Sequence, residues 1–334
     1  MPKRVAINGF GRIGRLFFRA AWGNKDLEVI SINDLFEPKY LAYSLKYDTV
    51  FGRFKGNVSS TDKELVIDGK KIPITKEREP GKLPHANNKI DVVVESTGRF
   101  TKKKEDAATH LTAGAKRVLI SAPSTSPDIT VVLGCNDDKL KPEHKIISMA
   151  SCTTNCLAPV VKVLHENFKI VNGLMTTIHS YTNDQVTCDI AREGDPGDML
   201  RGRAAAQNII PTRTGAARVI GEIFPDLKGK LDGHAIRVPT IDGSLIDLSC
   251  VLEKTATAEE INAKMKEAAG GKLKGILEYT DDPITNTDCI GNPASSIFNG
   301  IWTRAIGNNC KVYAWYDNEW GYSMRLVDLI AKKL

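Results

Sequence analysis

Along the first 150 residues, short apolar runs alternate with segments whose apolar residues recur at helical spacing. The runs typical of buried strands occupy residues 4–9, 27–34, 89–98, 116–123, 129–136 and 144–151. Helical spacing covers the intervening residues 12–23, 40–48 and 104–115. Continuous apolar strands separated by helices indicate a parallel sheet that is covered on both faces. We therefore expect an α/β domain over residues 1–151.

After residue 151 the pattern changes to longer segments in which apolar and polar residues alternate, at 174–182 and 234–254. Such alternation favours an antiparallel or mixed sheet with one covered face. Thr257 and Glu260 have capping-box spacing at the start of a helix that ends near a glycine pair. We expect an α+β domain over residues 152–318, and a final helix, about 319–334, that packs back on the first domain.

The composition is that of an ordinary globular protein, with 42% hydrophobic and 26% charged residues. No apolar run approaches the length of a membrane span, and the first residues lead directly into a strand without a secretory segment. The seven cysteines are irregularly spaced, which suggests reduced thiols and a cytoplasmic location. The net charge of +6 is diffuse, so it favours small anions and does not indicate nucleic acid.

The stretch INGFGRIG places Gly9, Gly11 and Gly14 at G-x-G-x-x-G spacing between a strand and a helix. Asp34 follows at the end of the next strand. Glycines in this context let backbone amides approach a pyrophosphate at a helix N-terminus, and the acidic residue accepts hydrogen bonds from a ribose. The first domain is therefore predicted to be of the Rossmann type and to bind a dinucleotide.

Two cysteines four residues apart, Cys152 and Cys156, have a spacing that fits half a metal site, a redox pair, or one nucleophile with a bystander. A zinc site would need two more ligands, and no such cluster follows, so we expect no metal. With Ser151 as N-cap, Cys152 lies in the first helical turn, where helix amides are expected to lower the pKa of the thiol. Cys156, one turn further on, is expected to be buried and inert.

A base for this thiol is suggested by a strand-like segment in which Met175, Thr177, His179 and Tyr181 share one face. His179 could then project from a sheet toward Cys152. Together they would form an activated nucleophile and its base.

Nine motifs together closely resemble the phosphorylating glyceraldehyde-3-phosphate dehydrogenase family: INGFGRIGR, STGRF, ISAPS, ASCTTNCLAP, TTIHSYTNDQ, RGRAAAQNIIP, TGAA, RVPT and WYDNEWGYS. The resemblance extends from residue 4 to the C-terminus. Its most specific element is SCTTNC followed by a histidine 27 residues after the first cysteine.

The resemblance implies that Cys152 attacks the aldehyde of D-glyceraldehyde 3-phosphate, that His179 acts as base, and that inorganic phosphate releases the thioester. It also implies NAD as cofactor and a homotetramer. The positions that match cofactor-binding residues are Gly9, Gly11, Arg12, Ile13, Gly14, Asp34, Arg78, Ser96, Thr97, Ser121 and Asn318. Thr182 and Arg237 match the site for the substrate phosphate, and the site for the attacking phosphate is matched by Ser151, Thr153, Thr214 and Gly215.

Three segments depart from the family pattern. The loop 186–200 looks longer than usual and lacks a common Leu-Pro, Arg213 stands where a small hydroxyl residue is usual, and TIDGS at 240–244 replaces a more apolar run. Two other functions remain open on this scaffold, namely erythrose-4-phosphate dehydrogenase and a non-catalytic redox or RNA-binding role. The three residues Cys152, His179 and Arg237 argue against a pure binding protein, which has no need of all three.

Overall fold

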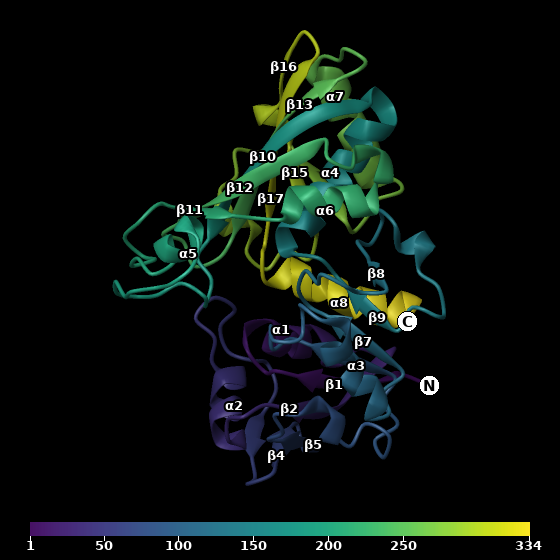
Figure 1. The fold of residues 1–334 in the computed structure, drawn as a ribbon, viewed down its shortest axis with the longest axis vertical. Coiled ribbons are helices and arrows are strands. Elements are labelled where there is room, and N and C mark those ends of the chain that lie inside the picture. The colour runs from purple at the N-terminus through teal and green to yellow at the C-terminus, as the bar shows by residue number, and fades with distance from the viewer. The chain divides into compact units, whose positions relative to one another are not determined.

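The computed structural model describes residues 1–334 (Figure 1). The chain forms two compact units. Unit 1 comprises Met1–Val131, Asp137–Ala150 and Ser323–Leu334, and unit 2 comprises Val132–Asn136 and Ser151–Tyr322.

Unit 1 is built on a nine-stranded sheet in the order β3-β4-β5-β2-β1-β6-β7-β9-β8. From β5 to β8 all neighbouring strands are parallel. The strands are β1 (Lys3–Asn8), β2 (Leu27–Asn33), β3 (Val58–Ser60), β4 (Glu64–Ile67), β5 (Lys70–Thr75), β6 (Val92–Glu95), β7 (Arg117–Ile120), β8 (Ile129–Thr130) and β9 (Ile146–Ser148). The helices before residue 150 are α1 (Arg12–Ala21), α2 (Pro38–Lys46) and α3 (Lys104–Thr112).

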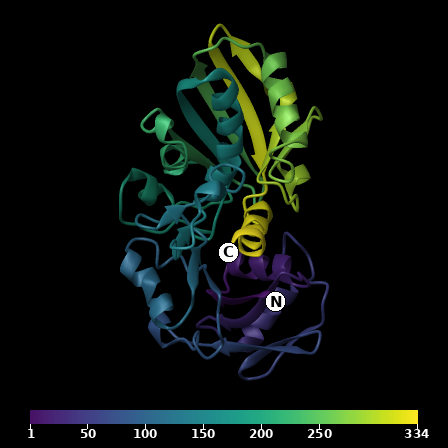
Figure 2. The same cartoon turned by 90° about the vertical axis from the view of Figure 1, so that its right-hand side faces the viewer.

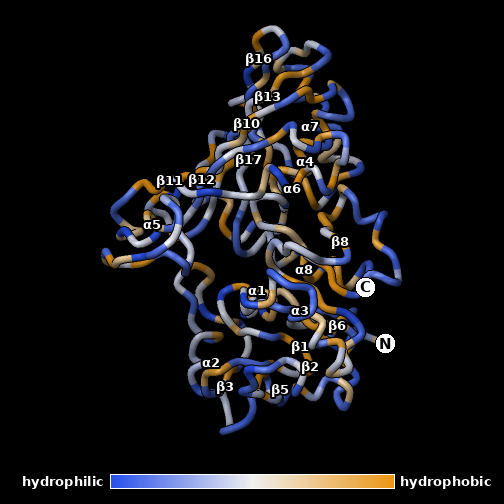
Figure 3. The backbone as a smooth tube through the Cα atoms, viewed as in Figure 1, coloured by the Kyte–Doolittle hydropathy of each residue, from blue (hydrophilic) through white to orange (hydrophobic).

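The strands in the parallel part of this sheet are rich in apolar residues, as expected where both faces are covered. Val92, Val93 and Val94 point alternately to opposite faces, yet all three are buried, so both faces are covered. The predicted α/β class is confirmed. Orange, hydrophobic segments recur along the strands and helices (Figure 3).

Two local predictions in unit 1 need correction. The strand expected over residues 129–136 ends at Thr130, since the Asn136 side chain accepts a hydrogen bond from the amide of Val132 and closes a turn there. The antiparallel ribbon β3-β4-β5 was not predicted. Its hairpin contains Asp68 and Gly69, both with positive φ, and this dipeptide is a recognised signal for a two-residue turn.

Unit 2 is built on an eight-stranded mixed sheet in the order β11-β12-β10-β13-β17-β15-β14, with β16 paired to β17. Two neighbouring pairs, β10 with β12 and β14 with β15, are parallel, and the other pairs are antiparallel. The strands are β10 (Ile170–Ser180), β11 (Ile210–Arg213), β12 (Leu231–Val238), β13 (Ser244–Leu252), β14 (Leu277–Thr280), β15 (Ser296–Asn299), β16 (Arg304–Ile306) and β17 (Asn309–Tyr316). The predicted α+β class with a mixed sheet is confirmed.

One face of this sheet carries the core. The helices after residue 150 are α4 (Cys152–Phe168), α5 (Pro196–Leu200), α6 (Ala216–Ile223), α7 (Ala258–Gly270) and α8 (Trp320–Lys333). Helix α4 packs on β13, β15 and β17 and lies beside α7 along the sheet (Figure 2). On the opposite face Leu174 is 70% exposed, as expected for a sheet with one covered face. The capping box of Thr257 and Glu260 at the start of α7 is confirmed.

Candidate active site

Cys152 is the first residue of helix α4 in unit 2. The Ser151 side chain accepts a hydrogen bond from the amide of Thr154, so the predicted N-cap is confirmed. The helix continues into the core, where Cys156 is fully buried and its Sγ lies 3.5 Å from Oγ of Ser296. Cys156 is thus buried as expected, whereas Cys152 keeps part of its surface exposed at the helix start.

His179 is the penultimate residue of β10, and its Nε2 lies 3.5 Å from Sγ of Cys152. Met175, Thr177 and His179 are all buried, as the alternation predicted. The Nδ1 of His179 lies 2.6 Å from the carbonyl oxygen of Ser180. Because a carbonyl oxygen only accepts, this contact places the ring proton on Nδ1. The bare Nε2 therefore faces the thiol and can accept its proton.

Tyr316, at the end of β17, joins the helix of the thiol to the strand of the base. Its hydroxyl lies 2.8 Å from Oγ1 of Thr153 and 2.9 Å from Oγ1 of Thr177. The same ring packs edge-on against His179, with the centroids 6.0 Å apart. Since Tyr316 is buried, these contacts fix the start of α4 against β10.

The protonation of the pair is set mainly by burial. Loss of hydration raises the pKa of the Cys152 thiol to about 11, although the charge of Arg237 and hydrogen bonds at the helix start act in the opposite direction. Burial, followed by the charge of Arg237, lowers the pKa of His179 to about 3. Hydrogen bonds at the helix start do lower the pKa of Cys152, as predicted, but desolvation outweighs them, so the net shift is upward. Near neutral pH the two groups form a neutral thiol and imidazole.

Arg237 lies on β12, directly beside His179 in the parallel pairing of β10 with β12. Its Nη1 is 3.0 Å from Nδ1 of His179 and 3.4 Å from Oγ1 of Thr182. The guanidinium therefore lies between the His179 ring and the Thr182 hydroxyl and contacts both. The guanidinium suits a phosphate, and the Thr182 hydroxyl would join it by turning away from Asp184, to which it donates.

Two further charged residues border this cluster and were missed by the sequence analysis. Asp184 accepts hydrogen bonds from Thr182 and Arg201. Burial alone would raise the pKa of Asp184, but the Thr182 hydrogen bond and the charges of Arg201 and Arg237 hold it below its usual value. All of these residues except Arg237 lie in or beside the irregular segment 181–203, where periodicity carries no signal.

The other residues expected around an attacking phosphate lie at the starts of two neighbouring helices. Thr214 and Gly215 precede α6, and Oγ1 of Thr214 accepts a hydrogen bond from the amide of Ala216. Helices α4 and α6 are in contact, and Oγ1 of Thr154 lies 3.5 Å from the carbonyl oxygen of Ala216. Two helix N-termini side by side offer backbone amides to an anion.

Two side chains near these helix starts have partners of their own. The hydroxyl of Thr153 is engaged by Tyr316, so an anion would meet its backbone amide. The unusual Arg213 forms an ion pair with Asp195, the N-cap of α5, at 2.9 Å.

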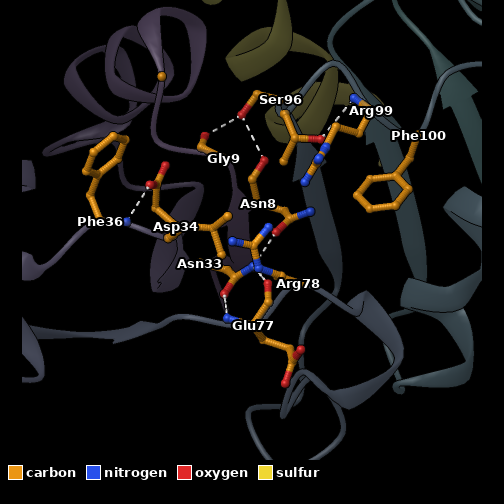
Figure 4. Close-up of a pocket in the computed structure, with 13 residues that line it drawn as sticks. Asn8, Gly9, Asn33, Asp34, Phe36, Glu77, Arg78, Ser96, Arg99 and Phe100 are labelled. Atoms are coloured by element: carbon orange, nitrogen blue, oxygen red, sulfur yellow. Dashed lines mark hydrogen bonds between the residues drawn. The ribbon is translucent and has the colours of Figure 1, made fainter.

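Unit 1 contains a separate cavity of about 260 Å³ at the carboxyl ends of β1, β2 and β6 (Figure 4). Of the predicted cofactor residues, the lining includes Gly9, Gly11, Asp34, Arg78, Ser96 and Thr97. Arg12, Ile13, Gly14 and Ser121 lie outside it. The position of this cavity is the one at which parallel α/β sheets bind ligands.

The reason for glycine differs among the three positions of the motif. Gly9 has φ of +91°, and a Cβ on Gly14 would lie 2.1 Å from the carbonyl oxygen of Gly9, so both are required by the fold. A Cβ on Gly11 would meet no protein atom, although Gly11 lines the cavity and caps α1. The missing side chain leaves the amides of the helix start open to a ligand, which fits the pyrophosphate of NAD.

The remaining predicted cofactor residues are placed as follows. Asp34 accepts hydrogen bonds from the amides of Phe10 and Phe36, which fix its carboxylate at the cavity wall. The Arg12 side chain forms an ion pair with Asp48, so a ligand at the start of α1 would meet the backbone amide of Arg12 and not its guanidinium. The Ser121 hydroxyl donates to the carbonyl oxygen of Glu95. In unit 2, Oδ1 of Asn318 accepts from Ser244, which leaves its amide group as a donor.

No group of three or more His, Cys, Asp or Glu side chains is arranged to hold a metal ion, and no helix is long and apolar enough to cross a membrane. All seven cysteines are free.

Comparison with known proteins gives two family matches. Residues 3–103 match the NAD binding domain of glyceraldehyde 3-phosphate dehydrogenase, and residues 151–318 match its C-terminal domain. The chain is 54% identical over 333 residues to glyceraldehyde-3-phosphate dehydrogenase of Geobacillus stearothermophilus, covering 99% of this chain and 98% of the relative. It is also 54% identical to the Mycobacterium avium protein of that name, over 99% and 98% of the two chains. Glyceraldehyde-3-phosphate dehydrogenase 2 of Streptomyces avermitilis is 52% identical, over 98% of each chain.

Proposed function

Because the chain belongs to the glyceraldehyde-3-phosphate dehydrogenase family, we propose that Cys152, His179 and Arg237 carry out its reaction. The protein is a glycolytic, NAD-dependent oxidoreductase. The reaction converts D-glyceraldehyde 3-phosphate, phosphate and NAD to 1,3-bisphosphoglycerate and NADH. The observation that supports the residue roles is the 3.5 Å contact between the Cys152 thiol and the bare Nε2 of His179.

The first step is addition of the Cys152 sulfur to the aldehyde carbon. Since the thiol and imidazole are neutral in the resting protein, His179 accepts the thiol proton as the carbon–sulfur bond forms and then passes it to the aldehyde oxygen. The product is a hemithioacetal on Cys152. Arg237 and Thr182 hold the substrate phosphate beside this pair.

Phosphate binding at Arg237 also changes the base. The guanidinium lies 3.0 Å from Nδ1 of His179, and its charge lowers the pKa of that ring. A phosphate dianion on Arg237 offsets this charge, so the imidazolium form becomes less costly once substrate is bound. The base is thereby strengthened when it is needed.

When bound, NAD would supply the hydride acceptor for oxidation of the hemithioacetal. The residues that would hold it are those of the unit 1 cavity, with Asp34 at the adenosine ribose and the Gly11 turn at the pyrophosphate. His179 takes the hydroxyl proton as the carbonyl re-forms, which leaves a thioester on Cys152. Asn318 is assigned to the carboxamide.

Inorganic phosphate then attacks the thioester carbon, and the Cys152 thiolate leaves and regains a proton from His179. The amides at the starts of α4 and α6, with Ser151, Thr153, Thr214 and Gly215, would bind the incoming phosphate. The oxygen of phosphate replaces sulfur, so the thiol is restored without hydrolysis.

The test is an absorbance assay for NADH with D-glyceraldehyde 3-phosphate, with and without inorganic phosphate. We expect turnover that depends on phosphate, loss of turnover in Cys152→Ser, and substantial activity in the matched variant Cys156→Ser. Robust turnover without phosphate would refute the thioester release step. A parallel series with D-erythrose 4-phosphate decides the alternative substrate, and a higher kcat/KM for erythrose 4-phosphate would replace the assignment.

We further propose that the protein is a cytoplasmic homotetramer. Its seven free thiols suit a reducing compartment, and exposed apolar side chains such as Leu174, Ile209 and Ile306 offer surface for subunit contacts. Light scattering coupled to size-exclusion chromatography should give four times the mass of the chain, and a monomer at micromolar concentration would contradict the assembly. Subcellular fractionation tests the location.

A further inference from the structure

Two turns in unit 2 bring a pair of aspartates together behind the base. Asp242 lies between β12 and β13, in the segment 240–244 that departs from the family pattern. Asp317 lies between β17 and α8. Both are buried, with exposures of 0% and 2%, and the pairing of Ser244 with Tyr316 places the two turns at the same end of β13 and β17. The two carboxyl groups influence each other's pKa through a side-chain contact.

Asp317 is placed to be the ionised member of the pair. Its Oδ1 accepts hydrogen bonds from the amides of Glu319 and Trp320, at 2.8 and 2.6 Å. Its Oδ2 accepts from the amide of Gly291 at 2.7 Å. Burial raises the pKa of Asp317, but these three backbone donors act in the opposite direction and favour its carboxylate over that of Asp242.

Asp242 has the opposite surroundings. Its Oδ1 accepts only from the amide of the next residue, Gly243, at 2.8 Å, and its Oδ2 is buried without a hydrogen-bond partner. An ionised Oδ2 here would face the Asp317 carboxylate without compensation. A protonated Oδ2 would instead donate to Asp317, which satisfies both groups.

Two further titratable groups, Glu319 and Cys289, lie near the pair. Glu319 adds a further negative charge, and burial raises the pKa of the neighbouring Cys289 thiol to about 12, so that it stays neutral. Burial, followed by the charges of Asp317 and Glu319, raises the pKa of Asp242 to about 9. This upward shift favours the protonated form of Asp242 at neutral pH.

The Asp242 turn is in direct contact with the residue that orients the base. The carbonyl oxygen of Gly243 accepts from Oγ of Ser180 at 2.9 Å, and Oγ of Ser244 accepts from the amide of Ser180 at 3.1 Å. Ser180 in turn supplies the carbonyl that fixes Nδ1 of His179. Ser244 also donates to Oδ1 of Asn318 at 2.6 Å.

We propose that Asp242 is a positioning residue which keeps its proton and donates it in a hydrogen bond to Asp317, so that the 240–244 turn holds His179 through Ser180 and Asn318 through Ser244. The effect on His179 and Asn318 rests on the proposed function, whereas the shared proton does not. The turn has little freedom to adjust by other means, because Gly243 has φ of +80° and a Cβ there would lie 2.3 Å from the carbonyl oxygen of Asn286.

The proton is tested directly by infrared difference spectroscopy of the purified protein. Subtracting the spectrum of Asp242→Asn from that of the wild type at pH 7 should show the carbonyl stretch of one protonated carboxyl group, and this band should disappear around pH 9. Asp282→Asn, at an exposed aspartate of the same unit, is the control and should remove no such band. Absence of the band in the wild type at pH 7 would overturn the proposal, whatever the enzymatic activity proves to be.

The positioning role is tested by the pH dependence of kcat and of KM for NAD. In the wild type, kcat should decline above about pH 9 by up to tenfold per pH unit, as Asp242 loses its proton. Asn carries a permanent donor in place of this proton. Asp242→Asn should therefore retain activity within about threefold at pH 8 and should not show the alkaline decline in kcat. Asp242→Ala lacks the donor and should lower kcat and raise KM for NAD at least tenfold at pH 8. An Asn variant as impaired as the Ala variant, or a wild-type and Asn profile that coincide from pH 8 to 10, would refute the role.

Discussion

The hydroxyl of Tyr316 offers a sharp test of how the thiol and its base are kept in register. Tyr316→Phe removes only the oxygen that lies 2.8 Å from Thr153 and 2.9 Å from Thr177. A buried hydrogen bond contributes about 0.5–1.5 kcal/mol, so the loss of two should destabilise unit 2 by about 1–3 kcal/mol. The two threonine hydroxyls would be left without this partner in a buried site.

Tyr316→Phe should also lower kcat. Thr153 follows Cys152 on α4 and Thr177 shares the β10 face with His179, so the bridge sets the 3.5 Å distance between sulfur and Nε2. A displacement of about 1 Å can cost about 100-fold in rate, and we expect kcat to fall about 10- to 100-fold. Substrate KM should change little because Arg237 lies on a different strand.

The assays are urea unfolding followed by fluorescence and steady-state kinetics at pH 8. The matched control is Tyr313→Phe, on the same strand but partly exposed, which should alter stability by no more than about 0.5 kcal/mol and leave kcat unchanged. If Tyr316→Phe behaved like this control in both assays, the bridge would have no role in aligning the pair.

Four further outcomes follow from the charges and contacts of the two sites. Alkylation of Cys152 by iodoacetamide, read by mass spectrometry, should accelerate with pH toward a midpoint near 11, because burial raises the pKa of the thiol, and a midpoint near 7 would contradict this. His179→Asn should reduce the single-turnover rate of hydride transfer by about 100- to 10,000-fold, whereas a loss below tenfold would assign the proton transfer elsewhere. The wild type should prefer NAD to NADP by roughly 100-fold in kcat/KM, about 2.8 kcal/mol, and Asp34→Gly should erase most of that preference; equal use of both by the wild type would disprove it. Since burial raises the folded-state pKa of Asp242, its contribution to stability is fully present below its unfolded pKa near 3.8 and is lost as pH rises to about 9. The urea-unfolding free energies of the wild type and Asp242→Asn should therefore diverge in favour of the variant as pH rises through this range, and parallel pH profiles would contradict this.

The strand and helix classes could be predicted because periodicity reports which face of an element is buried. It placed β1, β2, β6, β7 and β9 in one parallel sheet and put Thr177 and His179 on one face of β10. It does not report which strands become neighbours. The approach of Tyr316 to both Thr153 and Thr177 depends on the order β10-β13-β17, which the local pattern does not encode.

The candidate site was predicted unevenly for the same reason. The contact of Cys152 with His179 could be anticipated from a helix start and a strand end, each of which has a sequence signal. The pKa of the thiol could not, because desolvation depends on everything packed around the sulfur. Arg201 and Asp184 meet in an irregular segment, and the sequence of the 240–244 turn carries no sign that Asp317 lies near Asp242.

The return of the C-terminal residues to unit 1 has a consequence for biosynthesis. The chain leaves unit 1 after Ala150 and rejoins it at Ser323, so 172 residues (151–322) are made before the unit can be completed. At ribosomal rates of about 5–20 residues per second this takes about 9–34 s. During that time the nascent unit lacks Leu326, Leu329 and Ile330, which are fully buried in the finished protein, and lacks the terminal oxygen of Leu334 to which Lys3 and Arg117 donate. The amino-terminal half therefore emerges from the ribosome with an open core, and a chain stopped a dozen residues early would remain a client of chaperones.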